Sequence, residues 1–335
     1  MERIAPFVLE RPATIAEAVA LLAATPGARP LAGGTDLLPN LRDGIGESPL
    51  LVDLGGIGGF SAITVERDRT TIGAGVTLAR IASDAKIAGA LPALAEAAAT
   101  VAGPGHRTVA TLGGNLCLDT RCVFYNQSEW WRRANDFCLK HGGDVCHVAP
   151  QGKHCHAAFA GDLAPVLLVF DATVEIVGPA GARALPLATL YLDDGARHLS
   201  LAPGEIVTAV RIPAQLASVR TGYRKARARG AIDFPLAGVA AQVAMNGGRL
   251  GALRIALTGT NARPFLLDGT NALIGAATTD EALTQLGKLV QKQVSPMRTT
   301  VTHSYYRRQV AAVLARRLVR ELAAEAVAGV GATSG

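Results

Sequence analysis

Four widely spaced cysteines are the residues of this chain best suited to chemistry. They follow the pattern C-x15-C-x7-C-x8-C at Cys122, Cys138, Cys146 and Cys155, and Cys117 precedes them. A single reduced cysteine usually serves as a small buried hydrophobic residue. Four in one segment with little apolar periodicity are different, because thiolates that bind a metal centre also supply the energy that orders the segment. Zinc and an iron-sulfur cluster both accept four thiolates, so the spacing leaves the identity of the centre open.

Histidines in the same stretch widen the choice of ligands. His141, His147, His154 and His156 offer mixed Cys/His sets of the kind that bind zinc. The stretch has no C-x-x-C knuckle, which weighs against zinc without proving a cluster. A structureless segment of about forty residues is unusual inside a compact domain. We therefore expect an insertion that something other than a hydrophobic core organises.

Two glycine loops form a second site of chemical interest. Glycine lets backbone amides approach an anion closely, and consecutive amides form a concave nest for phosphate oxygens. Neither loop matches the G-x-G-x-x-G or G-x-x-x-x-G-K-[ST] fingerprint. The two loops either hold a dinucleotide diphosphate from two sides or are plain turns. They consist of Ala32, Gly33, Gly34, Thr35, Asp36 and Leu37, and of Thr111, Leu112, Gly113, Gly114 and Asn115.

Helix and strand patterns alternate around these loops. A capping-box pair, Thr14 and Glu17, starts the first predicted helix. Apolar periodicity and turn residues predict the other elements. Predicted strands cover 30–32, 50–54, 63–65, 71–72, 173–177, 182–186, 205–212, 237–245 and 250–257, and further predicted helices cover 79–87, 91–102, 280–290 and 304–328.

Length and composition bound the class of protein. A chain of 335 residues predicts two lobes, with a boundary near 213–220. A hydrophobic content of 49% suits an ordinary globular protein rather than a disulfide scaffold or a disordered chain. The net charge of +6 owes much to arginines late in the chain, which fit one solvated helix face better than a nucleic-acid site. Residues 1–14 contain no sustained apolar run, so we expect a cytoplasmic protein with reduced thiols that binds neither nucleic acid nor membrane.

The two glycine loops resemble the paired FAD loops of the flavin subunits of the xanthine dehydrogenase and carbon monoxide dehydrogenase family. Their order and separation are similar, and the resemblance extends over nearly the whole chain. It includes Asp162-Leu163-Ala164-Pro165, Glu205-Ile206-Val207, Tyr223-Arg224-Lys225 and Tyr306-Arg307-Arg308. It implies an α+β fold with a two-part FAD-binding domain of the vanillyl-alcohol-oxidase/PCMH type over 1–216. An α/β C-terminal domain of the CO dehydrogenase flavoprotein type would follow over 217–330.

The resemblance also implies the flavin contacts. Both glycine loops would bind the diphosphate and the ribityl chain, and Val101, Asp162, Val207 and Lys225 would be further contacts. A lysine near the pyrimidine end would stabilise the negative charge that reduced flavin develops. The alternative for Lys225 is a solvated lysine at a strand end. Relatives carry an aromatic residue at the place of Val101, so stacking on the flavin is not implied there.

The segment at about 118–158 resembles the insertion of the 4-hydroxybenzoyl-CoA reductase branch of that family, whose flavin subunit carries an additional 4Fe-4S cluster. On this resemblance Cys122, Cys138, Cys146 and Cys155 are the ligands, and Cys117 is a packing residue. The chain would have no catalytic residue of its own. It would relay electrons from a low-potential donor such as ferredoxin to a small subunit with two 2Fe-2S clusters and a large molybdenum-cofactor subunit, in a dimer of heterotrimers.

Reductive removal of the phenolic hydroxyl would then give benzoyl-CoA. Two other functions remain open at this point. One is the flavin subunit of an oxidatively working molybdenum hydroxylase with another aromatic substrate, because the same relay runs in either direction. The other is a zinc-stabilised interaction module, which would rest on the cysteines and histidines of the insertion and on the basic last helix.

Overall fold

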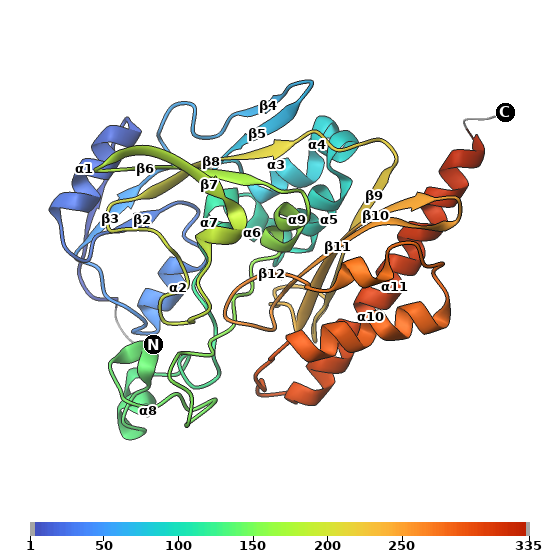
Figure 1. Cartoon of the computed structure of the whole chain (residues 1–335). Coiled ribbons are helices and arrows are strands. Elements are labelled where there is room, and N and C mark those ends of the chain that lie inside the picture. Colours follow the sequence, from blue (N-terminus) through green and yellow to red (C-terminus); the bar gives the residue numbers. More distant parts are fainter. Residues whose placement is uncertain (1–3, 333–335) are drawn as a thin grey trace.

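Three β-sheets and the helices packed on them make up the protein, in a computed structural model that describes residues 4–332 (Figure 1). The expected α+β fold class is confirmed. The first sheet is parallel, with the order β1-β3-β2, from β1 (Val8–Glu10), β2 (Arg29–Leu31) and β3 (Leu50–Asp53). Within the described residues, no helix is both long and apolar enough to cross a bilayer.

Helix α1 (Ile15–Ala24) packs on the first sheet as the sequence predicts. The Thr14 side chain accepts a hydrogen bond from the Glu17 amide at 3.2 Å, and the Glu17 carboxylate accepts one from the Ala13 amide at 2.8 Å. The first bond is the Thr14 half of the predicted capping box, whereas Glu17 bonds to the amide one residue before the cap rather than to the Thr14 amide. The first glycine loop follows β2 and leads into α2 (Leu37–Arg42).

The second sheet is antiparallel and carries the strand order β4-β5-β8-β6-β7. Helices and short turns that pack beside it carry the second glycine loop. The strands are β4 (Ile63–Val65), β5 (Arg69–Gly73), β6 (Thr173–Gly178), β7 (Gly181–Pro186) and β8 (Ile206–Pro213). The helices are α3 (Leu78–Ser83), α4 (Ala85–Ala90), α5 (Pro92–Thr100), α6 (Pro104–Arg107), α7 (Leu112–Leu116), α9 (Leu163–Val169) and the 3-10 helix η2 (Leu187–Leu190).

The sequence predicts one helix over 79–87, but the structure has two, α3 and α4. Asp84 divides it, because its carboxylate caps the second helix by accepting from the amides of Lys86 and Ile87 at 2.9 and 3.1 Å. A side chain that bonds to the amides ahead of it starts a helix rather than continuing one. The division lies away from the glycine loops.

The third sheet, with the order β12-β11-β10-β9, has helices on both faces. Helices α5 and α9 contact one face, and α11 contacts the other with α10 beside it (Figure 1). The sequence predicts β10 and β11 but not β9, whose residues mix charged and apolar types without strict alternation. The bounds are β9 (Val219–Ala226), β10 (Ala237–Asn246), β11 (Arg249–Thr258), β12 (Phe265–Leu266), η3 (Thr270–Leu273), α10 (Asp280–Gln293) and α11 (Ser304–Ala332).

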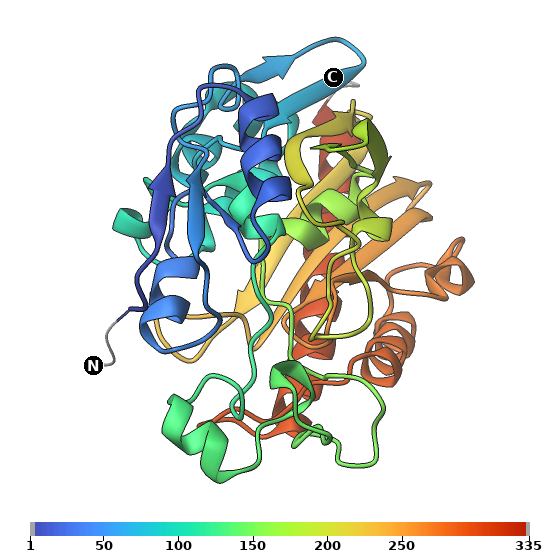
Figure 2. The ribbon, with the colours of Figure 1, turned by 90° about the vertical axis from the view of Figure 1, so that its left-hand side faces the viewer.

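The insertion protrudes at one end of the molecule, next to the segment that precedes α11, in both views of the ribbon (Figures 1 and 2). Paired backbone bonds of 2.8 Å between Arg121 and Ala158 close its base. It contains the helix α8 (Glu129–Ala134) and the 3-10 helix η1 (Leu139–His141). The sequence analysis missed α8, although Ser128 caps it by accepting from the Trp131 amide.

The insertion has a small core of its own, so the expectation that no hydrophobic contacts organise it is wrong in part. Tyr125 and Ala157 pack there with Ile45 and with Met297 of the C-terminal region. Arg132 is 2% exposed and donates to the Gly44 carbonyl at 2.6 Å and to the Tyr125 carbonyl at 3.4 Å. These contacts fix the insertion to both lobes.

Candidate functional site

A cavity of about 680 Å³ lies between the two glycine loops. Residues from the N-terminal sheet, from α5 to α7, from β8 and from the loop after β9 surround it. Thirteen of the fourteen flavin contacts expected from the sequence line this cavity. They are Ala32, Gly33, Gly34, Thr35, Asp36, Leu37, Val101, Thr111, Gly113, Gly114, Asn115, Asp162 and Val207.

The first glycine loop offers free amides to this cavity. Among the described residues, the amides from Gly33 to Leu37 donate no hydrogen bond within the protein. Gly34 has a φ of +68°, a conformation that L side chains rarely adopt. A run of unpaired amides facing a cavity fits an anionic group such as a diphosphate. The free amides leave the first loop able to form such a nest, which stays a prediction.

The second glycine loop differs from that prediction. The Leu112 and Gly113 amides donate to the carbonyls of Val76 and Ala74 at 2.9 and 2.8 Å. The Gly114 amide meets the Thr111 hydroxyl at 3.1 Å, as a cap of α7. These three amides already donate hydrogen bonds within the protein, so they are not free to bind an anion. The second loop therefore packs closely at the cavity wall and does not form a second open nest.

Two glycines allow close packing at the cavity, Gly33 against the chain that leads into the second loop and Gly113 against Ala74 next to β5. A Cβ on Gly33 would lie 2.1 Å from the Val109 carbonyl oxygen, just before the second loop. A Cβ on Gly113 would lie 2.8 Å from the Ala74 Cβ. Only glycine permits backbone contact at these distances. The cavity's shape therefore depends on both residues lacking side chains.

A buried ion pair forms another wall. The Asp162 carboxylate accepts from the Lys225 ammonium at 2.9 Å and from the Tyr223 hydroxyl at 2.6 Å. The Lys225 and Asp162 side chains are 2% and 3% exposed, which excludes the alternative of a solvated lysine. Burial raises the pKa of Asp162, and Lys225 opposes that rise. Lys225 does not line the cavity, whereas Asp162 does. The positive charge of Lys225 therefore affects the cavity by compensating the negative charge of Asp162.

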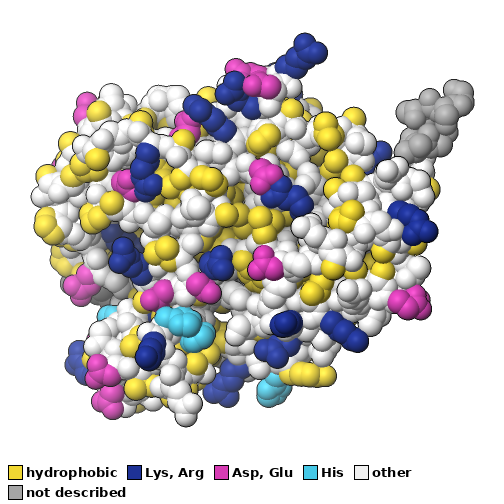
Figure 3. All heavy atoms as spheres, in the orientation of Figure 1, with side chains coloured by type: hydrophobic (Ala, Val, Ile, Leu, Met, Phe, Trp, Pro, Cys, Tyr) yellow, Lys and Arg dark blue, Asp and Glu magenta, His cyan; other side chains and the backbone are white. Residues whose placement is uncertain are grey.

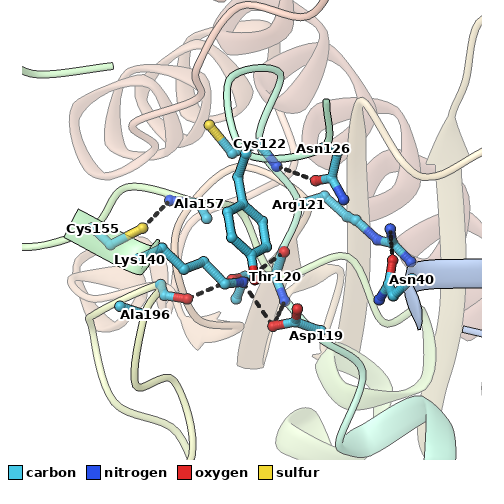
Figure 4. Close-up of polar contacts among 12 residues, drawn as sticks. Asn40, Asp119, Thr120, Arg121, Cys122, Asn126, Lys140, Cys155, Ala157 and Ala196 are labelled. Atoms are coloured by element: carbon cyan, nitrogen blue, oxygen red, sulfur yellow. Dashed lines mark hydrogen bonds and ion pairs between the residues drawn. The ribbon is translucent and has the colours of Figure 1, made fainter. Parts of the chain in front are cut away.

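Arg121, at the base of the insertion, is a cavity residue that the sequence analysis missed. Its guanidinium forms an ion pair with Asp36 of the first loop. It also donates to the Asn40 side chain at 2.7 Å (Figure 4). The same group lies over the Phe234 ring, 5.0 Å from its centroid. Burial lowers the pKa of Arg121 to about 10. Nothing in the local sequence indicates that an arginine beside Cys122 reaches a loop more than eighty residues away.

Cys122 and Cys155 of the insertion are buried, and other cysteines of the insertion affect their ionisation. Burial raises the pKa of the Cys122 thiol, and the nearby Cys138 and Cys146 raise it further. Burial likewise raises the pKa of Cys155 to about 12, and Cys146 and Cys122 add to the rise. Charged thiols influence one another in this way only at short range. Cys117 stands apart, since burial alone raises its pKa to about 12.

Backbone amides point at two of these sulfurs. The Phe124 amide donates to the Cys122 sulfur and the Ala157 amide to the Cys155 sulfur, each at 3.4 Å, the latter drawn in Figure 4. Such bonds stabilise a thiolate. Within residues 4–332, however, no group of three or more His, Cys, Asp or Glu side chains is arranged so that it could hold a metal ion.

Lys140 binds the residues at the start of the insertion. Its ammonium is 6% exposed and donates to the Asp119 carboxylate at 2.7 Å and to the Thr120 carbonyl at 2.9 Å (Figure 4). It also lies 4.6 Å from the centroid of the Tyr125 ring.

Histidine side chains gather where the insertion meets the rest of the molecule (Figure 3), and the rings of His154 and His156 are 4.3 Å apart.

Family models match both parts of the chain. The model described as the FAD binding domain in molybdopterin dehydrogenase matches residues 5–215. The model described as the CO dehydrogenase flavoprotein C-terminal domain matches residues 221–322. Together with the cavity, these matches define the class of protein as an FAD-binding flavoprotein.

Individual relatives are similar in sequence to this chain over most of their length. The carbon monoxide dehydrogenase medium chain of Afipia carboxidovorans is 29% identical, over 96% of this chain and 98% of the relative. The aldehyde oxidoreductase FAD-binding subunit PaoB of Escherichia coli is 31% identical, over 79% of this chain and 85% of the relative. A crystal structure of the Cu,Mo-CO dehydrogenase superposes with a TM-score of 0.78 at 28% identity, over 96% of this chain and 98% of that one. The chain belongs to the molybdenum hydroxylase family of the CO dehydrogenase and xanthine dehydrogenase type, as an FAD-binding subunit.

Proposed function

We propose that this chain is the FAD and 4Fe-4S electron-transfer subunit of a molybdenum-containing 4-hydroxybenzoyl-CoA reductase. It would take electrons from a low-potential donor such as ferredoxin and pass them to a small subunit with two 2Fe-2S clusters. A large molybdenum subunit would bind the substrate and carry out its reductive dehydroxylation to benzoyl-CoA. The complex would be a dimer of heterotrimers, with this chain folded over 1–216 as the FAD-binding domain and over 217–330 as the C-terminal domain.

The observation that carries the proposal is the separation of the cysteines into two groups. Cys138 and Cys146 raise the pKa of Cys122, and Cys146 and Cys122 raise the pKa of Cys155, whereas burial alone raises the pKa of Cys117. Four thiols within one insertion, two of which accept hydrogen bonds from backbone amides, fit a metal centre with four thiolate ligands. Because a four-iron cluster is larger than one ion, its ligands stand farther apart than those of zinc.

Bound cofactors would supply the redox chemistry, since a flavin exchanges one or two electrons and an iron-sulfur cluster exchanges one. The chain's own residues position them. The free amides of the first loop would receive the flavin diphosphate, and the buried pair of Lys225 and Asp162 would fix the charge on the opposite wall. Lys140 would offset the negative charge of a thiolate-ligated centre, since it lies close enough to affect the Cys155 thiol.

A second candidate is the flavin subunit of an oxidatively working enzyme. It is favoured by the names of relatives, which include a xanthine dehydrogenase FAD-binding subunit at 27% identity and a nicotine 6-hydroxylase medium subunit at 26% identity. The purified complex, assayed anaerobically with reduced low-potential donor and 4-hydroxybenzoyl-CoA, separates the two. Our proposal requires benzoyl-CoA. If no benzoyl-CoA forms, and the complex instead oxidises an aromatic substrate, the oxidative enzyme is favoured.

The ligand assignment has its own test. Cys138→Ser should lower the iron content of anaerobically purified protein while FAD remains bound, because the two sites use different segments. Cys117→Ser is the matched control, and it should keep its iron. Iron lost from the Cys117 variant and kept by the Cys138 variant would contradict the assignment. Zinc without iron in the unmutated protein would instead favour the zinc-stabilised module.

A further inference from the structure

Every carboxylate that lines the flavin cavity has a cationic partner. The five ion pairs are Asp36 with Arg121, Asp119 with Lys140, Asp162 with Lys225, Glu205 with Arg183, and Asp233 with Arg229. A cavity that receives a diphosphate must not present uncompensated negative charge. Two of the five cations, Arg121 and Lys140, come from the insertion rather than from the FAD loops.

Among these pairs, Arg121 is the cation that pairs with a carboxylate of the first glycine loop. Asp36 belongs to the first glycine loop, whose amides from Gly33 to Leu37 are free. Its carboxylate also accepts from the Asp119 amide at 3.4 Å, so a second residue near the base of the insertion reaches the same group. Asp36 and Arg121 are 22% and 23% exposed, a setting in which an unpaired charge is felt strongly by a neighbouring anion.

Two further contacts fix the Arg121 guanidinium. It donates to the Asn40 side chain of α2, and it stacks on Phe234 from the loop after β9. Among the described residues its Nε makes no hydrogen bond, although it is buried. The side chain therefore spans three segments that meet at the cavity: the first loop, the insertion and the C-terminal region.

We propose that Arg121 is a positioning residue of the flavin site, which neutralises Asp36 so that the first loop can accept the FAD diphosphate. The insertion would thus belong to the flavin site through its charge, in addition to any centre that its cysteines bind. This inference goes beyond the proposed electron relay. It needs only FAD binding, and its test uses FAD alone, so it can fail or succeed whether or not the insertion holds iron.

The test is a double-mutant cycle on the full chain, measured as the dissociation constant of FAD from quenching of flavin fluorescence. Arg121→Met should weaken FAD binding by roughly 30-fold, because it leaves the Asp36 carboxylate unpaired beside the diphosphate. In the Asp36→Asn background the same change should cost less than about threefold. An equal loss in both backgrounds would overturn the proposal, since Arg121 would then act without regard to Asp36. Unchanged affinity in Arg121→Met would overturn it as well.

Two further variants separate charge from scaffolding. Arg121→Lys keeps the cation and should bind FAD within about fivefold of the unmutated chain. A loss as large as that of Arg121→Met would contradict a role through charge. Arg298→Met is the matched control, because Arg298 is exposed and lies over the Phe124 ring of the insertion without lining the cavity. It should leave FAD affinity unchanged, and a loss comparable to that of Arg121→Met would show a general effect of net charge and overturn the proposal.

Discussion

Replacing Gly33 with alanine tests the close approach of the two glycine loops. The added Cβ would lie 2.1 Å from the Val109 carbonyl oxygen, 2.5 Å from its carbon and 2.8 Å from the Ala110 Cα. All three are backbone atoms, so no flexible side chain can move aside. Gly33 does not have a positive φ, so alanine suits its backbone conformation and the effect is one of contact alone.

The size of the effect follows from the distance that the loops must move. Ordinary contact begins at 3.4 Å, so the loops must separate by about 1.3 Å. Overpacking of this kind costs about 3 kcal/mol at the upper end of its usual range. Because both loops line the cavity, we expect FAD to bind about 100-fold more weakly. We also expect the apoprotein to unfold at a lower temperature.

Fluorescence titration with FAD and thermal unfolding followed by circular dichroism measure these two effects. Gly89→Ala is the matched control, because a Cβ there meets nothing within 4 Å and alanine favours its helix α4. It should bind FAD normally and be no less stable. The reasoning is refuted if Gly33→Ala keeps both the FAD affinity and the unfolding temperature of the unmutated chain.

Two other predictions concern ion pairs of the cavity. Lys225→Met should lower the free energy of unfolding by about 3 kcal/mol in a urea titration, because it leaves Asp162 buried and unpaired. Adding Asp162→Asn to this variant should restore most of the lost free energy. If it does not, the two residues do not act as a pair. Arg183 lowers the pKa of Glu205, so the pair should stabilise the protein above the carboxylate's ordinary pKa and lose this effect as the pH falls. Glu205→Gln should therefore lower the unfolding temperature at pH 7 but not at pH 3, and an equal difference at both pH values would count against it.

Local signals in the sequence were enough to predict several elements of both lobes. The capping box at Thr14 and the alternating strands β10 and β11 depend on neighbouring residues, so their patterns can be read from the chain. The glycine pairs likewise indicated both walls of the cavity. The split at Asp84 was missed because a continuous apolar pattern hid a side-chain cap.

Long-range charge pairing could not be predicted in the same way. Arg121 and Asp36 are distant in sequence, and so are Lys225 and Asp162, whose burial depends on the packing of β9 against α5. The second loop shows a related limit. Its sequence resembles an amide nest, but its amides bond to carbonyls near β5, which only the fold brings within reach.

The central claim is that one chain binds a flavin between its glycine loops and an iron-sulfur centre on its insertion. Iron, zinc and FAD, determined together on the anaerobically purified full chain without its partner subunits, test it most directly. The account predicts one FAD and about four irons per chain, with zinc absent. Zinc in place of iron, or a preparation without flavin, would contradict it.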